Sequence, residues 1–124
     1  MRDDSSVSTT VLIVDDHAVF RSAARKLLES DGFQVVGEAA DGASGVKLAR
    51  ELRPDVVLLD VVLPDLSGFE VAEELAAGPS RIVLVSSRGQ ADFGPRLRRS
   101  SAVGFVSKDR LSGESIRALL EHAA

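Results

Sequence analysis

Residues 56–60 read VVLLD, a continuous apolar run that ends at a carboxylate. Three other short apolar runs also end at or just before a polar side chain: Val11–Val14 before Asp15 and Asp16, Ile82–Val85 before Ser86, and Gly104–Val106 shortly before Lys108. If these runs are parallel strands of one open sheet, their carboxyl ends share an edge, where such sheets bind ligands. Three carboxylates, a hydroxyl and an ammonium would then meet in one cleft. Such a set can hold a divalent metal ion and a phosphoryl group.

The composition is that of a globular domain. The chain has 124 residues, 44% of them hydrophobic, which predicts one soluble domain that buries about two thirds of its unfolded surface. No apolar run approaches the roughly 20 residues of a membrane span, and the N-terminus lacks the apolar core of a signal peptide, so we expect a cytoplasmic protein without membrane contact. The net charge of −4 disfavours nonspecific nucleic-acid binding, which needs a basic face. The absence of cysteine excludes disulfides and thiolate metal sites.

Strand and helix signals alternate along the chain. Met1–Thr10 is polar and without periodicity, so we expect a flexible lead-in there, followed by one domain over residues 11–124. Phe33–Ala39 is a further strand candidate. Apolar spacing predicts helices at Ala18–Ser30, after Asp41 with Ala43, Val46 and Ala49 inward, around Phe69, Ala72, Leu75 and Ala76, and around Ile116, Leu119 and Leu120. Five strand–helix units with apolar strands predict an α/β fold, a doubly wound five-stranded parallel sheet with helices on both faces.

The order of four motifs carries a family resemblance. From Val11 to Leu120 the chain resembles the receiver domain of a bacterial two-component response regulator, a CheY-like domain. The motifs are VLIVDD (11–16), VVLLDVVLPDLSG (56–68), IVLVSS (82–87) and GFVSKD (104–109), close to the family's spacing. VVGEAADG (35–42) and ARELRPDVVLLD (49–60) more closely resemble receivers of the NarL/FixJ type, which usually precede a helix-turn-helix domain. The resemblance implies a flavodoxin-like strand order, 2-1-3-4-5. We expect either a free-standing domain or a piece of a longer protein.

The resemblance also implies a magnesium site. It assigns direct ligation to Asp16, Asp60 and the backbone carbonyl of Val62, with Asp15 acting largely through water. Carboxylates 4 Å apart repel by about 4 kcal/mol per pair at an effective dielectric constant of 20, so a divalent cation belongs among them. All-oxygen ligands next to phosphate oxygens suit Mg²⁺.

Asp60 is the predicted phosphoacceptor. Its carboxylate attacks a phosphoryl group in line and forms an aspartyl phosphate. The resemblance implies that the donor is a phosphohistidine on a sensor histidine kinase or a phosphotransfer protein. Lys108 contacts one phosphoryl oxygen and the hydroxyl of Ser86 donates to another, although a one-residue slip in the strand would exchange Ser86 with Ser87. The domain is then no enzyme but a regulator that assists its own phosphorylation and dephosphorylation.

The resemblance implies a switch that reports phosphorylation. Phe105 occupies the position of the aromatic ring that swings inward when the hydroxyl of Ser86 moves toward the phosphoryl group. The face built from the fourth helix, fifth strand and fifth helix reports the change to a downstream effector protein or to a DNA-binding domain not present in this chain. A homodimer that forms on phosphorylation is a further expected state. On this face Gly94–Pro95 departs from the family pattern, so we expect the fourth helix to run only from Pro95 to about Ser100.

Several acidic and basic residues have structural interpretations as well. Asp15 could cap the following helix, and Lys108 could be a solvated surface charge. For His17 a structural role near the helix start is favoured over a role as metal ligand or phosphodonor. Asp55 precedes its strand and lies at the wrong edge for a nucleophile, and Asp65 has the pattern of a turn after Pro64.

Two functions from other classes compete with the phosphoacceptor switch. One is a phosphorylation-independent interaction module that keeps the receiver-like fold, against which the complete set of acidic residues and Lys108 argues. The other is a Mg²⁺-dependent phosphohydrolase with an aspartyl nucleophile. Such enzymes place the nucleophile after the first strand in an Asp-x-Asp arrangement and usually carry a capping insertion. Here Asp15 and Asp16 are adjacent and there is little room for a cap.

Overall fold

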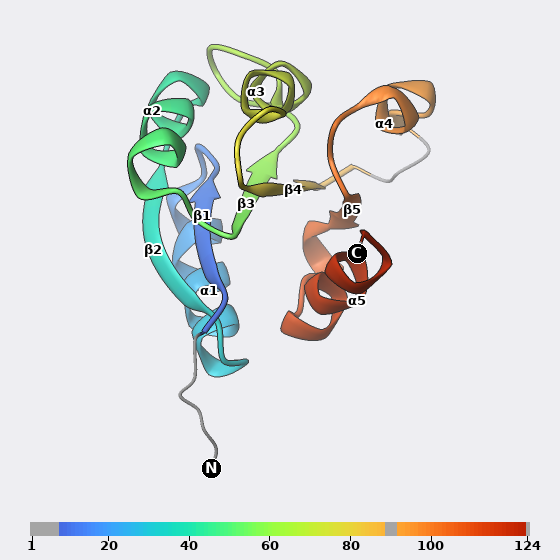
Figure 1. The fold of residues 1–124 in the computed structure, drawn as a ribbon. Coiled ribbons are helices and arrows are strands. Elements are labelled where there is room, and N and C mark those ends of the chain that lie inside the picture. Colours follow the sequence, from blue (N-terminus) through green and yellow to red (C-terminus); the bar gives the residue numbers. More distant parts are fainter. Residues whose placement is uncertain (1–7, 89–91, 124) are drawn as a thin grey trace.

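Strands and helices alternate along the whole of the described chain (Figure 1). A computed structural model describes residues 8–88 and 92–123. The strands are β1 (Thr10–Val14), β2 (Gln34–Ala39), β3 (Val56–Asp60), β4 (Arg81–Ser86) and β5 (Gly104–Ser107). The helices are α1 (Ala18–Ser30), α2 (Gly42–Leu52), α3 (Gly68–Leu75), α4 (Pro95–Arg99) and α5 (Gly113–Ala123), with a short 3₁₀ helix, η2 (Lys108–Arg110), after β5.

All strand pairs in the five-stranded sheet are parallel, and their order is β2-β1-β3-β4-β5. This order and the helices on both faces confirm the predicted fold. The apolar residues of the central strands β1 and β3 are fully buried, because helices cover both faces of the sheet. The chain turns from β1 to β2 on one side and later adds β3 on the other. The crevice at the carboxyl ends of β1 and β3 is therefore the expected ligand site.

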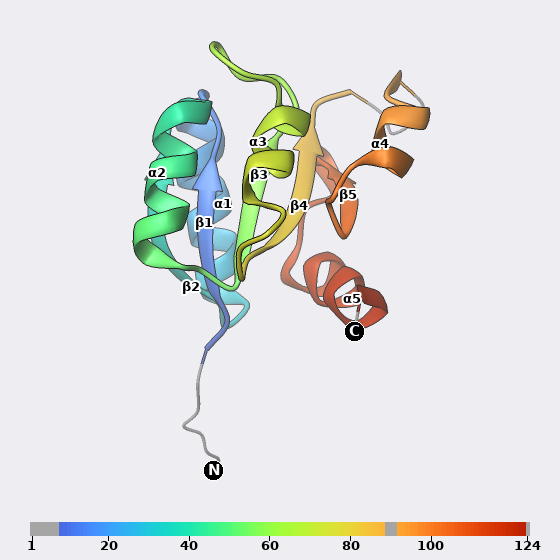
Figure 2. The ribbon, with the colours of Figure 1, turned by 45° about the horizontal axis from the view of Figure 1, so that its top comes forward.

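Two apolar layers pack on opposite faces of the sheet. One layer joins alternate strand residues to Leu28 of α1 and Ile116 of α5. The other joins the remaining strand residues to Ala49 of α2 and Phe69 of α3. Figures 1 and 2 show α2 and α3 on one side of the sheet and α1 on the other. Each fully buried Leu or Ile contributes about 1.5–3 kcal/mol of transfer free energy, so these layers hold the strand ends in register.

Some element details differ from the sequence prediction. β1 begins one residue earlier than expected, at Thr10, because Thr10 already pairs with Gln34 of β2. The backbone N–H and hydroxyl of Thr10 also donate to Asp55 Oδ2. Residues 1–7 of the expected lead-in lie outside the described residues. In α2 the expected inward residue Ala43 is exposed, and Gly45 is buried against Val14 instead. Because glycine has no apolar side chain, the apolar spacing in the sequence did not identify Gly45 as an inward residue of α2. Ala76, expected on the inner face of α3, is also exposed and follows the end of that helix.

Among the α-helices described, α4 is the shortest, with five residues. It begins at Pro95 and ends at Arg99, which confirms the late start predicted from Gly94–Pro95. Gly94 precedes it with a φ of 40°, a left-handed conformation that glycine adopts without steric cost. Within residues 8–88 and 92–123, a helix with both the length and the apolar composition for crossing a bilayer does not occur.

Candidate functional site

Three carboxylates meet at the carboxyl edge of the sheet. Asp15 and Asp16 follow β1, and Asp60 is the last residue of β3. The N–H of Asp15 donates to the carbonyl of Ala39 at 2.9 Å, which continues the pairing of β1 with β2 past the end of the strand. Asp15 is fully buried and Asp60 only 3% exposed. One ligand atom from each carboxylate and one from His17 lie within 4.8 Å of one another. The predicted convergence of the acidic residues is therefore confirmed.

Lys108 brings a positive charge to these carboxylates from the end of β5, the edge strand beyond β4. Its Nζ lies 2.7 Å from Asp15 Oδ2 and 3.1 Å from Asp60 Oδ2. The contact between Lys108 and the buried Oδ2 atom of Asp15 is an ion pair. Burial lowers the pKa of Lys108, but the two carboxylates outweigh this effect and raise the pKa overall. Lys108 is thus a charged, half-buried ammonium and not the solvated charge of the alternative interpretation.

The environment of Asp60 disfavours its charged form. Burial raises the pKa of the Asp60 carboxyl, and the neighbouring charge of Asp15 acts in the same direction. The N–H of Val62, which donates to Oδ1 at 3.0 Å, and the ammonium of Lys108 oppose this shift without cancelling it. A cation placed beside Asp60 favours the charged carboxylate. The site is therefore suited to hold such a cation together with a nucleophilic carboxylate.

The loop between β3 and α3 holds the backbone of Val62 next to Asp60. Val61 donates its N–H to Val85 at 3.0 Å and accepts one from Gly68 at 2.7 Å, so the loop folds back on itself. Gly68 packs against the backbone at Asp60 and Val61, where a Cβ atom would collide with the carbonyl of Asp60. The capping box of Ser67 then starts α3. The sequence SG at 67–68 is thus required by the close approach of α3 to the site.

Asp65 anchors the same loop to α2. Its carboxylate accepts the N–H groups of Gly42 at 2.7 Å and of Ala43 at 2.9 Å, at the start of α2. These donors lower the pKa of Asp65. Asp41, the N-cap residue, accepts a third N–H, from Ser44. The turn pattern at Asp65 gave no sign of this contact, because its partners lie more than 20 residues earlier in the chain.

His17 stands at the start of α1, and its ring also contacts the carboxylate cluster, which the sequence prediction of a structural role at the helix start did not include. His17 is the N-cap residue of α1, but its side chain makes no capping hydrogen bond with the described residues. Its extended backbone turns the ring back toward the site, where Nδ1 lies 3.0 Å from Asp15 Oδ1 and 3.2 Å from Asp16 Oδ1. The same atom lies 3.4 Å from Lys108 Nζ. All the polar contacts of this ring among the described residues are with the site.

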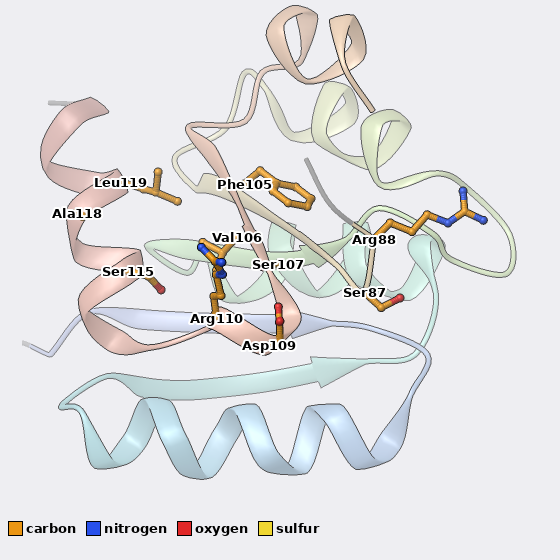
Figure 3. A pocket seen from close by; sticks show the side chains of 10 residues that line it. All are labelled: Ser87, Arg88, Phe105, Val106, Ser107, Asp109, Arg110, Ser115, Ala118 and Leu119. Atoms are coloured by element: carbon orange, nitrogen blue, oxygen red, sulfur yellow. The ribbon is translucent and has the colours of Figure 1, made fainter. Parts of the chain in front are cut away.

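The two candidate hydroxyls differ in burial. Ser86 ends β4 and is 2% exposed, and its Oγ accepts the N–H of Arg88 at 3.1 Å. Ser87 is exposed and lines a cleft of about 670 Å³ between α5, β5 and the segment after β4 (Figure 3). Phe105 of β5 lines the same cleft, and its ring centroid lies 5.9 Å from that of Phe93.

Comparisons with known proteins agree with this geometry. Residues 11–121 match the family model of the response regulator receiver domain. The chain is 42% identical over 110 residues to the virulence-factor transcription regulator BvgA of Bordetella pertussis, covering 87% of this chain and 53% of that protein. It is 38% identical over 112 residues to the response regulator GacA of Pseudomonas aeruginosa, covering 88% of this chain and 52% of GacA. The chain thus spans about half the length of the curated relatives it matches. The signal receiver domain of NarL from Mycobacterium tuberculosis superposes with a TM-score of 0.84 at 33% identity, covering 95% of this chain and 98% of that one.

Proposed function

The chain belongs to the response regulator receiver domain family, and from that premise we propose that it accepts a phosphoryl group on Asp60. The donor is a phosphohistidine on a sensor histidine kinase or a phosphotransfer protein. The observation that supports the proposal best is the contact between the buried carboxylate of Asp60 and Lys108 Nζ at 3.1 Å, beside two further carboxylates. This arrangement has the charges that a phosphoryl group and a divalent cation require.

The transfer is an in-line displacement at phosphorus. A carboxylate oxygen of Asp60 forms a bond to phosphorus while the bond to the donor histidine nitrogen breaks, and the electron pair stays on that nitrogen, which takes up a proton. The N–H of Val62 orients the attacking carboxylate through its bond to Oδ1. The ammonium of Lys108 attracts the transferred group electrostatically. The hydroxyl oxygen of Ser86 already accepts the N–H of Arg88, so its own proton is available for a phosphoryl oxygen.

The residues present fit the magnesium ion that the family implies. The three carboxylates supply oxygen donors that lie close enough to share one ion, with the ring nitrogen of His17 beside them. The single ammonium of Lys108 faces both Asp15 and Asp60, so one positive charge is shared between two buried carboxylates beside a third at Asp16. We propose direct ligation by Asp16, Asp60 and the carbonyl of Val62, with Asp15 acting largely through water. When bound, Mg²⁺ neutralises the negative charge that accumulates around the phosphoryl group.

An aromatic row links α3, the segment before α4, and β5. The ring of Phe69 in α3 lies 6.0 Å from that of Phe93 before α4, and Phe93 lies 5.9 Å from Phe105 in β5. We propose that Ser86 moves toward the phosphoryl group and that Phe105 turns inward with it, which reshapes the cleft beside α5. The partner that reads this change is an effector protein or a DNA-binding domain, in line with the transcription regulators among the relatives. Dimerisation on phosphorylation is a second way to read it.

Intact mass spectrometry after incubation with acetyl phosphate and Mg²⁺ tests the phosphoacceptor function. We expect a labile gain of one phosphoryl group, lost with EDTA and in Asp60→Asn. Asp55→Asn is the matched control, because Asp55 lies at the opposite end of β3 and its amide oxygen can still accept from Thr10. Labelling of Asp60→Asn would contradict the assignment of the acceptor. No labelling of a folded, Mg²⁺-binding protein by acetyl phosphate or by phosphorylated kinase would favour the interaction module. Multiple turnover of a phosphate ester would favour a phosphohydrolase.

A further inference from the structure

The imidazole of His17 adds a nitrogen donor to an otherwise all-oxygen set. Its Nδ1 lies 3.0 Å from Asp15 Oδ1, 3.2 Å from Asp16 Oδ1 and 3.9 Å from Asp60 Oδ2. Among the described residues, no backbone N–H of α1 donates a capping hydrogen bond to this ring. The side chain is 65% exposed, so it lies at the mouth of the site and can adjust without disturbing the core.

The contact of Nδ1 with Asp15 Oδ1 is a hydrogen bond in the absence of an ion, whereas the longer separations from Asp16 and Asp60 match those of ligands that share one cation. On an octahedral ion with bonds of about 2.1 Å, neighbouring ligand atoms are about 3.0 Å apart and opposite ones about 4.2 Å. On a tetrahedral ion with bonds of similar length, the ligand atoms are about 3.4 Å apart. The distances from Nδ1 to Asp16 and Asp60 lie within this range. A cation bound by these carboxylates can therefore also be reached by Nδ1, with a small rotation of an exposed ring.

Nitrogen and oxygen ligands select different ions. Mg²⁺ prefers oxygen ligands, whereas imidazole suits Co²⁺, Ni²⁺ and Zn²⁺. We propose that His17 is a ligand for first-row transition ions of this kind and makes the site select them over Mg²⁺ more strongly than its carboxylates would. The proposal rests on the proposed metal site of the receiver domain and adds to it a residue that determines ion specificity. His17 has no part in binding Mg²⁺.

The chain offers a well-controlled test, because it contains two histidines and no cysteine. His122 near the end of α5 is exposed and serves as the matched control. Co²⁺ and Mg²⁺ affinities are measured by calorimetry for the wild type, His17→Gln and His122→Gln, with circular dichroism to verify the fold. Visible absorption of bound Co²⁺ and paramagnetic shifts of the histidine ring signals report whether an imidazole is a ligand.

We expect His17→Gln to weaken Co²⁺ binding by about tenfold or more, the scale on which even partners outside the coordination sphere alter metal affinity. Mg²⁺ affinity should stay unchanged, and His122→Gln should behave as the wild type. Unchanged Co²⁺ affinity in His17→Gln, or an equal loss for both ions, would overturn the inference. In either case Mg²⁺-dependent labelling of Asp60 would still stand. If the wild type bound neither ion, the metal site of the proposed function would fail as well.

Discussion

Replacing Asp60 with asparagine should stabilise the fold when no divalent ion is present, although it removes the phosphoacceptor. The raised pKa of Asp60 means that the folded protein disfavours the charged carboxylate relative to the unfolded chain. Asparagine keeps the shape of the side chain and an oxygen that can accept the N–H of Val62, but carries no charge. Urea unfolding in EDTA at neutral pH should therefore show a higher midpoint for Asp60→Asn.

The size of the effect follows from the charges around Asp60. Two carboxylates within 4.8 Å each repel it by at least about 3.5 kcal/mol at an effective dielectric constant of 20. Lys108 at 3.1 Å attracts it by about 5 kcal/mol on the same scale. Repulsion and burial together exceed the attraction, in agreement with the direction of the pKa shift. We therefore expect Asp60→Asn to gain on the order of 1–2 kcal/mol in the free energy of unfolding, the usual scale for a single substitution.

The pH dependence gives the sign a second test. A folded pKa above the unfolded pKa lowers stability as the pH rises between the two values, so the deficit is complete above the folded pKa. The advantage of Asp60→Asn should therefore shrink as the pH falls through the folded pKa of Asp60, and vanish below its unfolded pKa. Mg²⁺ at ten times its dissociation constant should stabilise the wild type by about 1.4 kcal/mol, and Asp60→Asn by less.

Circular dichroism is the appropriate probe for these unfolding curves, because the chain contains neither Trp nor Tyr. Asp109→Asn, at an exposed carboxylate of η2, controls for the general effect of removing one negative charge from a chain of net charge −4. The reasoning is refuted if Asp60→Asn is less stable than the wild type in EDTA at neutral pH. A gain of the same size in Asp109→Asn, or one that persists undiminished into acid, would refute it equally.

Three further changes test the loop that positions the site. Gly68→Ala should lower the free energy of unfolding by about 1–3 kcal/mol in urea melts, because its Cβ atom collides with the backbone at the end of β3; Gly78→Ala, where a Cβ makes only ordinary contact, should not. Ser67→Ala removes the capping box of α3 and should cost about 1 kcal/mol in the same melts, with an unchanged m-value. Asp65→Ala should speed hydrogen exchange at the Gly42 amide and raise the pH midpoint of acid unfolding. The depressed pKa of Asp65 gives stability that is present above its unfolded pKa and lost as the pH falls through its folded pKa; unchanged exchange and an unchanged midpoint would contradict this.

Local patterns were sufficient to predict the sheet and most of the site. The apolar runs before Asp15 and Asp60 mark strands buried on both faces, and a parallel sheet brings their carboxyl ends to one edge whatever the helices do. The four ordered motifs placed Lys108 on the same edge. These inferences succeed because the position of a residue at the end of an apolar run depends on local sequence alone.

The contacts that complete the site were decided by packing between distant segments. Asp65 accepts a backbone N–H at the start of α2. The missing side chains of Gly45 and Gly68 allow Val14 and the backbone at the end of β3, respectively, to pack closely against them. The sequence indicates only that these three residues belong to a turn or a helix. The contacts of His17 with the carboxylates could not be read from the sequence, because they depend on the extended backbone that turns its ring toward Asp15 and Asp16. The sequence by itself determined the sheet and the residues at its edge. Only the tertiary structure decided how close they lie and which charges face them, since distance and burial set the pKa of Asp60 and the ligands available to a cation.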